Sequence, residues 1–337
     1  MRALQLLDHR LDALTVVEGL AVPEPGAGEI LIRVGAVSLN HRDLLAASGR
    51  LAALPALPLV PGSDAVGEVV ALGAGARRWR PGDRVMTLFT PGWHDGAPTL
   101  VHRGRTLGGP LPGVLQDYVV LSEEDAVRVP EGWSDEEAST LPIAALTAWA
   151  VLADGGLAAD QWVLTQGTGG VALFALQFAK AAGARVIALS SSEDKLRRLR
   201  ALGADVLVDY RATPHWSSAV REATGGRGVE IVVETAGSTL GQSIMASSLG
   251  GFVGVVGFTG GMTAEVPVRV LLGGLVRVHG FFVGSRARFE QMAAALPASG
   301  VRPVIDRVFD LAQARAAFEH LRSGAHFGKV VVRLRDR

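Results

Sequence analysis

The sequence contains no cysteine in its 337 residues. Disulfides, thiol nucleophiles and thiolate metal ligands are therefore excluded. An excess of one charge is also missing, because 33 Lys and Arg residues balance 33 Asp and Glu residues. Such a balance provides no global attraction to nucleic acid or to a membrane surface.

Long apolar runs are missing too. No segment is apolar for long enough to span a bilayer, and the first residues, MRALQLLDHR, lack the apolar centre of a signal peptide. We therefore expect a soluble, cytoplasmic protein that binds neither nucleic acid nor membrane. The length is sufficient for two domains with a sizeable core.

The most informative stretch is residues 161–195. An apolar run, Trp162–Leu164, predicts a buried strand, and the periodic residues after it predict a helix that ends near Gly183. A second strand is expected over Arg185–Leu189. The turn between the first strand and the helix consists of Gly167, Thr168, Gly169 and Gly170, and Val171 begins the helical pattern; all five are candidate cofactor contacts.

The glycines of this turn have separate functions. Gly167 permits a tight turn, Gly169 lets the backbone approach a pyrophosphate, and Ala172 keeps helix and strand close. The free N–H groups and the dipole at a helix start attract phosphates. The pattern predicts dinucleotide binding. The alternative is an ordinary glycine-rich turn in a parallel sheet.

The end of the second strand indicates which dinucleotide. An acidic residue there would bind the ribose 2′-hydroxyl of NAD, but this chain has Ser190, Ser191 and Ser192. Small hydroxyl groups leave room for a 2′-phosphate and can donate hydrogen bonds to it. With Lys195 and Tyr210 as further contacts, the sequence favours NADP(H). The serines can alternatively cap the helix that starts near Glu193.

The pattern along the chain changes near residue 129. Before it, short β-like runs separated by Gly and Pro predict a mostly antiparallel β domain. After it, a helix start with Ser134 as N-cap and Glu137 three residues on is followed by strand–helix alternation. Six parallel strands, the last over Val276–Val283, predict a doubly wound sheet. We expect an α/β protein with domains 1–128 plus 284–337 and 129–283.

Five segments are together specific to a family. They are VPGSDAVGEVVALGAGARRWRPGDRV (60–85), LPIAALTAWAVL (141–152), QGTGGVALFALQFAK (166–180), LGADVLVDYR (202–211) and GAHFGKVVVRL (324–334). On these segments the chain resembles the medium-chain dehydrogenase/reductase family over nearly its whole length, and most closely its zinc-independent, quinone-oxidoreductase-like branch. The resemblance implies a GroES-like substrate domain interrupted by a Rossmann domain, with the active site in the cleft between them.

The resemblance also addresses metal binding. Zinc-dependent members bind catalytic zinc through Cys, His and Cys, and these positions correspond here to Asn40, Ser63 and Ile143. Amide, hydroxyl and alkyl groups do not make a zinc site, so we expect no metal. Asp64, beside Ser63, is expected to be a structural hydrogen-bond acceptor.

Without zinc, another group must polarise the substrate. The resemblance places SLNHRDLLAASG (38–49) in the cleft, which makes Asn40, His41 and Arg42 the candidate catalytic residues. Asn40 can donate an amide hydrogen bond to a developing oxyanion. His41 has a pKa range suited to proton transfer. Arg42 and Asp43 could form an ion pair that fixes this loop. The alternatives are that His41 points outward and that Asp43 only caps the helix that begins at Leu44.

Further cofactor contacts follow from the family pattern and the sheet. Thr147 matches a residue that contacts the nicotinamide and its ribose, and Lys329 matches a basic residue that reaches the cofactor phosphates. Ligands of such sheets bind at the carboxyl ends of the strands. The candidates at those ends are Gly237, Gly257, Phe282 and Val283.

These observations predict an NADPH-dependent, zinc-independent reductase of a quinone or an α,β-unsaturated ketone. An NAD(P)-dependent alcohol or aldehyde oxidoreductase and a non-catalytic NADPH-binding protein are the alternatives. A small molecule is the expected substrate, and its identity does not follow from the sequence. The run VRVHGFFV (276–283) is expected at an open sheet edge, and the resemblance implies that two copies pair there as a homodimer.

Overall fold

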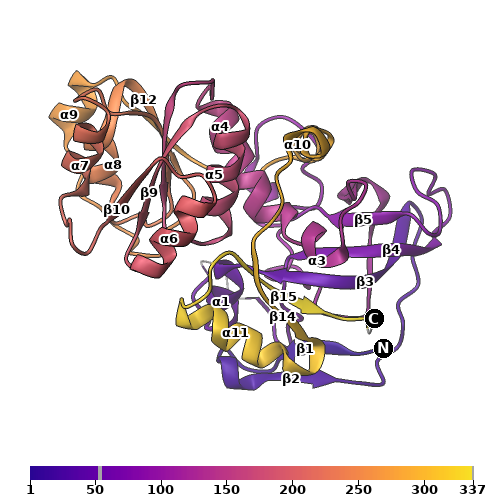
Figure 1. The fold of residues 1–337 in the computed structure, drawn as a ribbon. Coiled ribbons are helices and arrows are strands. Elements are labelled where there is room, and N and C mark those ends of the chain that lie inside the picture. Colours follow the sequence, from indigo (N-terminus) through magenta and orange to yellow (C-terminus); the bar gives the residue numbers. More distant parts are fainter. Residues whose placement is uncertain (52–54, 336–337) are drawn as a thin grey trace. The chain divides into compact units, whose positions relative to one another are not determined.

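The computed structural model describes residues 1–51 and 55–335. The chain divides into two compact units (Figure 1). The first comprises residues 1–144, 284–298 and 302–337, and the second comprises residues 145–283 and 299–301.

The first unit is built on a mixed sheet with strand order β14-β15-β3-β4-β5-β7 and with β6 also paired to β3. A separate antiparallel pair, β1-β2, precedes it in the chain. All pairs in the large sheet are antiparallel except β14–β15. The strands are β1 (Ala3–Leu6), β2 (Leu14–Val17), β3 (Glu29–Leu39), β4 (Asp64–Leu72), β5 (Arg84–Thr87), β6 (Tyr118–Ser122), β7 (Ala126–Arg128), β14 (Ile305–Asp310) and β15 (Lys329–Arg333).

The register of this sheet brings three distant segments together. Val330 of β15 lies opposite Leu39 of β3, and Ser38 of β3 lies opposite Asp64 of β4. The end of β3 is therefore adjacent to the starts of β15 and β4. Asn40, the residue after β3, caps helix α1.

Short helices complete the first unit. A capping box forms at α1, where the Asn40 N–H donates to the Asp43 carboxylate. The predicted capping box of Ser134 and Glu137 is confirmed at α3. The helices are α1 (His41–Ala47), α2 (Leu100–Arg103), α3 (Asp135–Ala138), α10 (Arg286–Ser299) and α11 (Ala314–Ser323), with 3₁₀ turns η1 (Leu11–Ala13), η2 (Glu123–Asp125) and η4 (Leu311–Gln313) and the π-helix η3 (Leu141–Ala145).

The second unit is a parallel sheet with strand order β10-β9-β8-β11-β12-β13. This is the doubly wound order, in which the direction of winding reverses between β8 and β11. The strands are β8 (Trp162–Gln166), β9 (Arg185–Ser190), β10 (Val206–Asp209), β11 (Val229–Glu234), β12 (Ser247–Val255) and β13 (Arg277–Gly280). The helices are α4 (Leu146–Asp154), α5 (Gly170–Ala181), α6 (Glu193–Ala201), α7 (Trp216–Ala223), α8 (Leu240–Ala246) and α9 (Val268–Gly273).

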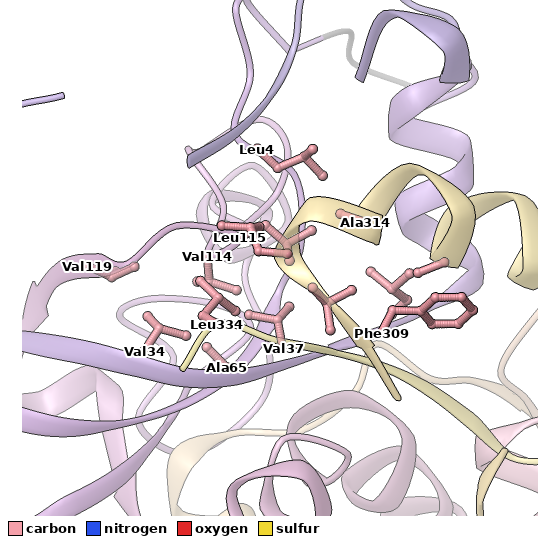
Figure 2. Close-up of a cluster of buried hydrophobic side chains, with 14 of the residues drawn as sticks. Leu4, Val34, Val37, Ala65, Val114, Leu115, Val119, Phe309, Ala314 and Leu334 are labelled. Carbon is pink, nitrogen blue, oxygen red and sulfur yellow. The ribbon is translucent and has the colours of Figure 1, made fainter. Parts of the chain in front are cut away.

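Each unit has its own apolar core. In the first, side chains from β3, the 114–115 segment and α11 pack together, and Figure 2 shows Val37, Leu115 and Phe309 among them. In the second, Leu164, Ile187 and Val232 from the central strands are buried beneath the helices. Burial of these side chains fixes the strands whose ends form the sites described below.

Two sequence expectations need correction. Residues 129–144 belong to the first unit, because α3 packs against β3, β4 and β15 and is held there by ion pairs from Arg84 and Arg333. The last strand of the parallel sheet ends at Gly280, so Phe282 and Val283 lie beyond it. Val283 has a φ of 58°, which no strand residue adopts.

None of the helices in the described part of the chain is both long enough and apolar enough to span a bilayer.

Candidate functional site

The glycine turn joins β8 to α5 in the second unit. Gly167 has a φ of 76°, and its N–H donates to the Leu189 carbonyl at 2.8 Å. Gly169 is the N-cap of α5, and a Cβ built on it would meet nothing within 4 Å. The first N–H groups of α5 have no partner within the helix, so they are available to an anion above Gly169. Open space over free amides is the geometry that a pyrophosphate requires. Thr168 lies within the turn, and Gly170 and Val171 are the first two residues of α5.

A buried carboxylate holds the adjacent strand end. Glu234, the last residue of β11, is 0% exposed and accepts hydrogen bonds from Gln166 Nε2 at 2.7 Å and from the Gly237 N–H at 2.8 Å. Thr239 and Ser243 also donate to it. These bonds fix the ends of β8 and β11 at the point where winding reverses, which is where such sheets bind ligands. Sequence reasoning missed Glu234. An acid that ends the strand VEIVVE before the small residues of TAG was the available signal.

The serine run lies at the end of β9, as expected. Ser190 is buried, and its carbonyl accepts from the Tyr210 N–H at 3.1 Å, which brings Tyr210 to the same edge. Ser192 caps α6 by accepting from the Lys195 N–H at 3.5 Å. The capping alternative therefore holds for Ser192, while Ser190 and Ser191 do not cap the helix in this way.

The remaining predicted cofactor contacts lie in the second unit at different depths. Thr147 is buried in the first turn of α4. Gly257 follows β12, and a Cβ on it would come within 2.7 Å of the Thr235 carbonyl. Phe282 and Val283 follow β13 and are half-buried. Their roles in cofactor binding stay predictions.

A polar cluster in the first unit surrounds Asn40. Its Nδ2 donates to Asp64 Oδ2 at 2.9 Å, and its Oδ1 accepts from Lys329 Nζ at 2.6 Å. Lys329 also donates to the Leu39 carbonyl at 2.7 Å, and the Ile143 N–H donates to Asp64 at 3.2 Å. The expectation that Asp64 is a structural acceptor is confirmed by these bonds.

The charged members of the cluster are buried. Asp43 and Asp64 are 0% exposed, and Lys329 is 4% exposed. Burial raises the pKa of Asp64 to about 7, although the Lys329 ammonium opposes this rise. Burial also raises the pKa of Asp43. It lowers the pKa of Lys329, and the negative charges of Asp64 and Asp43 oppose that lowering. Desolvation is the largest cause in each case, and the opposite charges partly offset it.

Lys329 is buried in the first unit and is not a surface charge. Its ammonium donates to Leu39 and Asn40. The pairing of β15 with β3 brings Leu39 and Asn40 next to Lys329. The expected contact with the cofactor phosphates stays a prediction.

Arg42 makes contacts that the sequence did not indicate. Its guanidinium donates to the Leu107 carbonyl at 3.2 Å, to Thr106 Oγ1 at 2.7 Å and to the Gly109 carbonyl, and it lies 5.1 Å from the centre of the Phe89 ring. Arg42 therefore anchors the 106–109 loop. Its guanidinium does not form an ion pair with the Asp43 carboxylate. Burial lowers its pKa, which the Asp43 and Asp64 charges oppose.

His41 is the first residue of α1 and its side chain is exposed. Its pKa is lowered, mainly because neighbouring atoms displace water from the ring and secondarily by Arg50. An outward-pointing His41 agrees with the alternative weighed from the sequence. Exposure leaves the imidazole in contact with water.

The three zinc-ligand positions do not fit a zinc ion. Asn40 is bonded as described, Ser63 Oγ donates to the Leu107 carbonyl at 2.9 Å, and Ile143 offers an alkyl chain. Over residues 1–51 and 55–335, no group of three His, Cys, Asp or Glu side chains could hold a metal ion. The donor set of this site is amide and hydroxyl, which zinc does not select.

Comparison with known proteins shows the family of the chain. The alcohol dehydrogenase GroES-like domain matches residues 26–131, and the zinc-binding dehydrogenase family matches residues 170–298. A zinc-type alcohol dehydrogenase-like protein of Schizosaccharomyces pombe is 38% identical over 315 residues, which cover 91% of each chain.

Two solved structures are similar over nearly the whole chain. The crystal structure of an alcohol dehydrogenase candidate from Sinorhizobium meliloti has 43% identity and a TM-score of 0.93, and covers 99% of this chain and 98% of its own. A quinone oxidoreductase from Coxiella burnetii has 26% identity, a TM-score of 0.79 and 99% coverage of both chains.

The fold and the glycine turn between β8 and α5 define a nicotinamide dinucleotide-dependent oxidoreductase. The chain belongs to the medium-chain dehydrogenase/reductase superfamily, and its relatives are alcohol dehydrogenase-like.

Proposed function

We propose that this chain is an NADPH-dependent, zinc-independent oxidoreductase that reduces a quinone or an α,β-unsaturated carbonyl compound. The observation that carries the proposal is the chemistry of the three zinc-ligand positions. Asn40 and Ser63 use their polar groups in hydrogen bonds within the first unit, and Ile143 has no side-chain donor atom. A substrate carbonyl must then be polarised by a hydrogen-bond donor of the protein.

The choice of NADPH rests on the end of β9. Ser190 occupies the position where an acidic residue would bind the ribose 2′-hydroxyl of NAD, and Ser191, Lys195 and Tyr210 lie around the same strand end. A hydroxyl group and a lysine favour a 2′-phosphate, whereas a carboxylate would repel it.

The bound nicotinamide supplies the hydride of the reaction. Asn40 uses one Nδ2–H on Asp64. Its other Nδ2–H, held in the same amide plane, would donate to the oxygen of a bound substrate. His41, the next residue, passes a proton from water to the reduced product through its exposed imidazole. One hydride and one proton convert a quinone to a hydroquinone, or an enone to a saturated ketone.

A second candidate is an NAD(P)-dependent alcohol or aldehyde oxidoreductase. The printed names of two relatives, a zinc-type alcohol dehydrogenase-like protein and an alcohol dehydrogenase candidate, favour it. It requires a way to ionise an alcohol without metal, and His41 is the residue available for that step. The third candidate function is that of a non-catalytic NADPH-binding protein.

A coenzyme oxidation assay tests these candidates. Purified protein is given NADPH or NADH with a quinone, an enone or an aldehyde, and its metal content is measured by mass spectrometry before and after treatment with a chelator. Turnover with NADPH and a quinone or enone, unchanged by the chelator, supports the proposal. Turnover with aldehydes alone supports the alcohol dehydrogenase reading. Tight NADPH binding without turnover on any acceptor supports the non-catalytic reading.

We also propose that two copies pair through the β13 edge. β13 is the terminal strand of the parallel sheet, and its residues Arg277–Gly280 are all exposed. Leu272 and Leu275, just before it, are 73% and 65% exposed. An unpaired strand edge beside exposed apolar side chains is a surface that a second copy can cover. Light scattering should give the mass of a dimer, and a Val278→Lys variant should give that of a monomer. A monomeric wild type would contradict the pairing.

A further inference from the structure

Asn40 is the only asparagine in the sequence, and its amide is held at both ends. Lys329 Nζ donates to Oδ1 at 2.6 Å, and Nδ2 donates to Asp64 Oδ2 at 2.9 Å. A flipped amide would place its NH₂ group against the ammonium and its oxygen against the carboxylate. Both contacts would be repulsive, so charge fixes which way the amide points.

The identity of the cation is informative. Three of the 33 basic residues are lysines, Lys180, Lys195 and Lys329, and the others are arginines. Lys180 and Lys195 lie in the second unit, and Lys180 makes a surface ion pair with Asp205. At the buried position the chain has the compact ammonium, which reaches Leu39 and Asn40 together.

We propose that Lys329 is a positioning residue, a cation built into the chain that, together with Asp64, holds the Asn40 amide with its free N–H toward the substrate oxygen. This inference rests on the proposed function and assigns Lys329 a part in it. The first zinc-ligand position of the family thus contacts a lysine ammonium instead of a metal ion. Burial of Asp43 beside Asp64 gives this ammonium a second compensating charge.

The test separates positioning from cofactor binding. In Lys329→Met the aliphatic chain remains and the ammonium is lost. We expect kcat to fall roughly 10- to 100-fold, less than the roughly 100- to 1,000-fold loss when an oxyanion donor is removed outright, while the NADPH dissociation constant stays within about twofold. A cofactor-phosphate role predicts the reverse: NADPH binding weakened about tenfold or more with kcat nearly unchanged at saturation. That result would overturn the inference.

A double-mutant cycle identifies the residue through which Lys329 acts. If Lys329 acts on the substrate only through Asn40, then Lys329→Met should change kcat less than about twofold in an Asn40→Ala background. Equal losses in the two backgrounds would show that Lys329 acts by some route other than Asn40, and the inference would be wrong.

Two further measurements keep the inference testable if folding or turnover fails. Lys329→Met leaves Asp43 and Asp64 without their buried cation, so the variant Lys329→Met/Asp64→Asn removes one opposite charge as well. It should melt cooperatively and still show the loss of kcat, and a wild-type kcat would contradict the inference.

Protein labelled with ¹⁵N-asparagine gives one side-chain amide signal, from Asn40. We expect Lys329→Met to shift and broaden it, whereas an unchanged signal would overturn the inference. A wild type that turns over no acceptor refutes the proposed function alone, because this spectrum reports on the amide without catalysis.

Discussion

Gly169 and Gly167 offer a matched pair for testing the dinucleotide site. Gly169 has φ −79° and ψ 173°, an extended conformation that any residue adopts, and a Cβ on it meets nothing within 4 Å. Gly169→Val should therefore cost little stability, less than about 1 kcal/mol for the change of N-cap residue. Gly167 has a φ of 76°, so Gly167→Ala should cost about 1–2 kcal/mol through backbone strain.

Binding should change in the opposite sense. The valine side chain of Gly169→Val fills the open space over the first amides of α5, which an anion would otherwise occupy. Each charge-assisted hydrogen bond contributes about 1.5–3 kcal/mol, so loss of two such bonds weakens NADPH binding roughly 100-fold or more. Gly167→Ala leaves the space over Gly169 open and should bind NADPH closer to the wild-type affinity.

Two measurements on each variant check this reasoning. Thermal unfolding reports stability, and titration calorimetry reports the NADPH dissociation constant. The reasoning is refuted if Gly169→Val folds normally and binds NADPH within about threefold of the wild type, because two phosphate hydrogen bonds could not then depend on this turn. A Gly169→Val protein that does not fold would contradict the open space over residue 169.

Three further predictions concern other parts of the two units. Ser190→Asp should lower the ratio of kcat/KM for NADPH to that for NADH by about tenfold or more, because a carboxylate repels a 2′-phosphate; steady-state kinetics with both coenzymes measures it, and an unchanged ratio would count against the serine site. Arg42→Met should lower the free energy of unfolding by about 2–4 kcal/mol, because the buried carbonyls of the 106–109 loop lose a charged hydrogen-bond donor. The control Arg50→Met, at an exposed arginine, should change it by less than about 0.5 kcal/mol. Urea unfolding measures both. Asp64 has its pKa raised from 3.8 to about 7, so the stability it contributes is fully present below pH 3.8 and is lost as the pH rises through about 7. This amounts to up to about 4 kcal/mol, at about 1.4 kcal/mol per pH unit. The difference in unfolding free energy between the wild type and Asp64→Asn should follow that window, and a difference independent of pH would contradict it.

The cofactor half of the protein was largely readable from sequence because its signals are local. The turn of Gly167 and Gly169 lies between a strand and a helix that their own residues specify, and Ser190 is the last residue of the next strand. Strand–helix alternation then leaves the doubly wound order as the natural arrangement. Glu234 escaped notice because one acid in an apolar strand resembles a solvent-facing residue until its partners are known.

The cluster around Asn40 depends on pairing between distant strands. Lys329 is 289 residues from Asn40 along the chain, and the run VVVRL predicts a strand without indicating its neighbour. Arg42 reaches carbonyls 65 and 67 residues away in a loop that has no periodic pattern. Long-range contacts of this kind are set by the fold of the sheet, so the sequence motifs indicated Lys329 and Arg42 as candidates but did not indicate the contacts that they make.

The two buried acids, Glu234 and Asp64, differ in a way that bears on function. Both oxygens of Glu234 accept hydrogen bonds, from backbone amides and from Thr239, Ser243 and Gln166. Asp64 accepts through Oδ2, while its Oδ1 is buried and has no hydrogen-bond partner among the described residues. A fully bonded carboxylate is what a structural tie requires, whereas an incompletely bonded one costs free energy and is found where function depends on the site. This contrast favours a purely structural role for Glu234, whereas the incompletely bonded carboxylate of Asp64 lies beside Asn40, the residue proposed to contact the substrate.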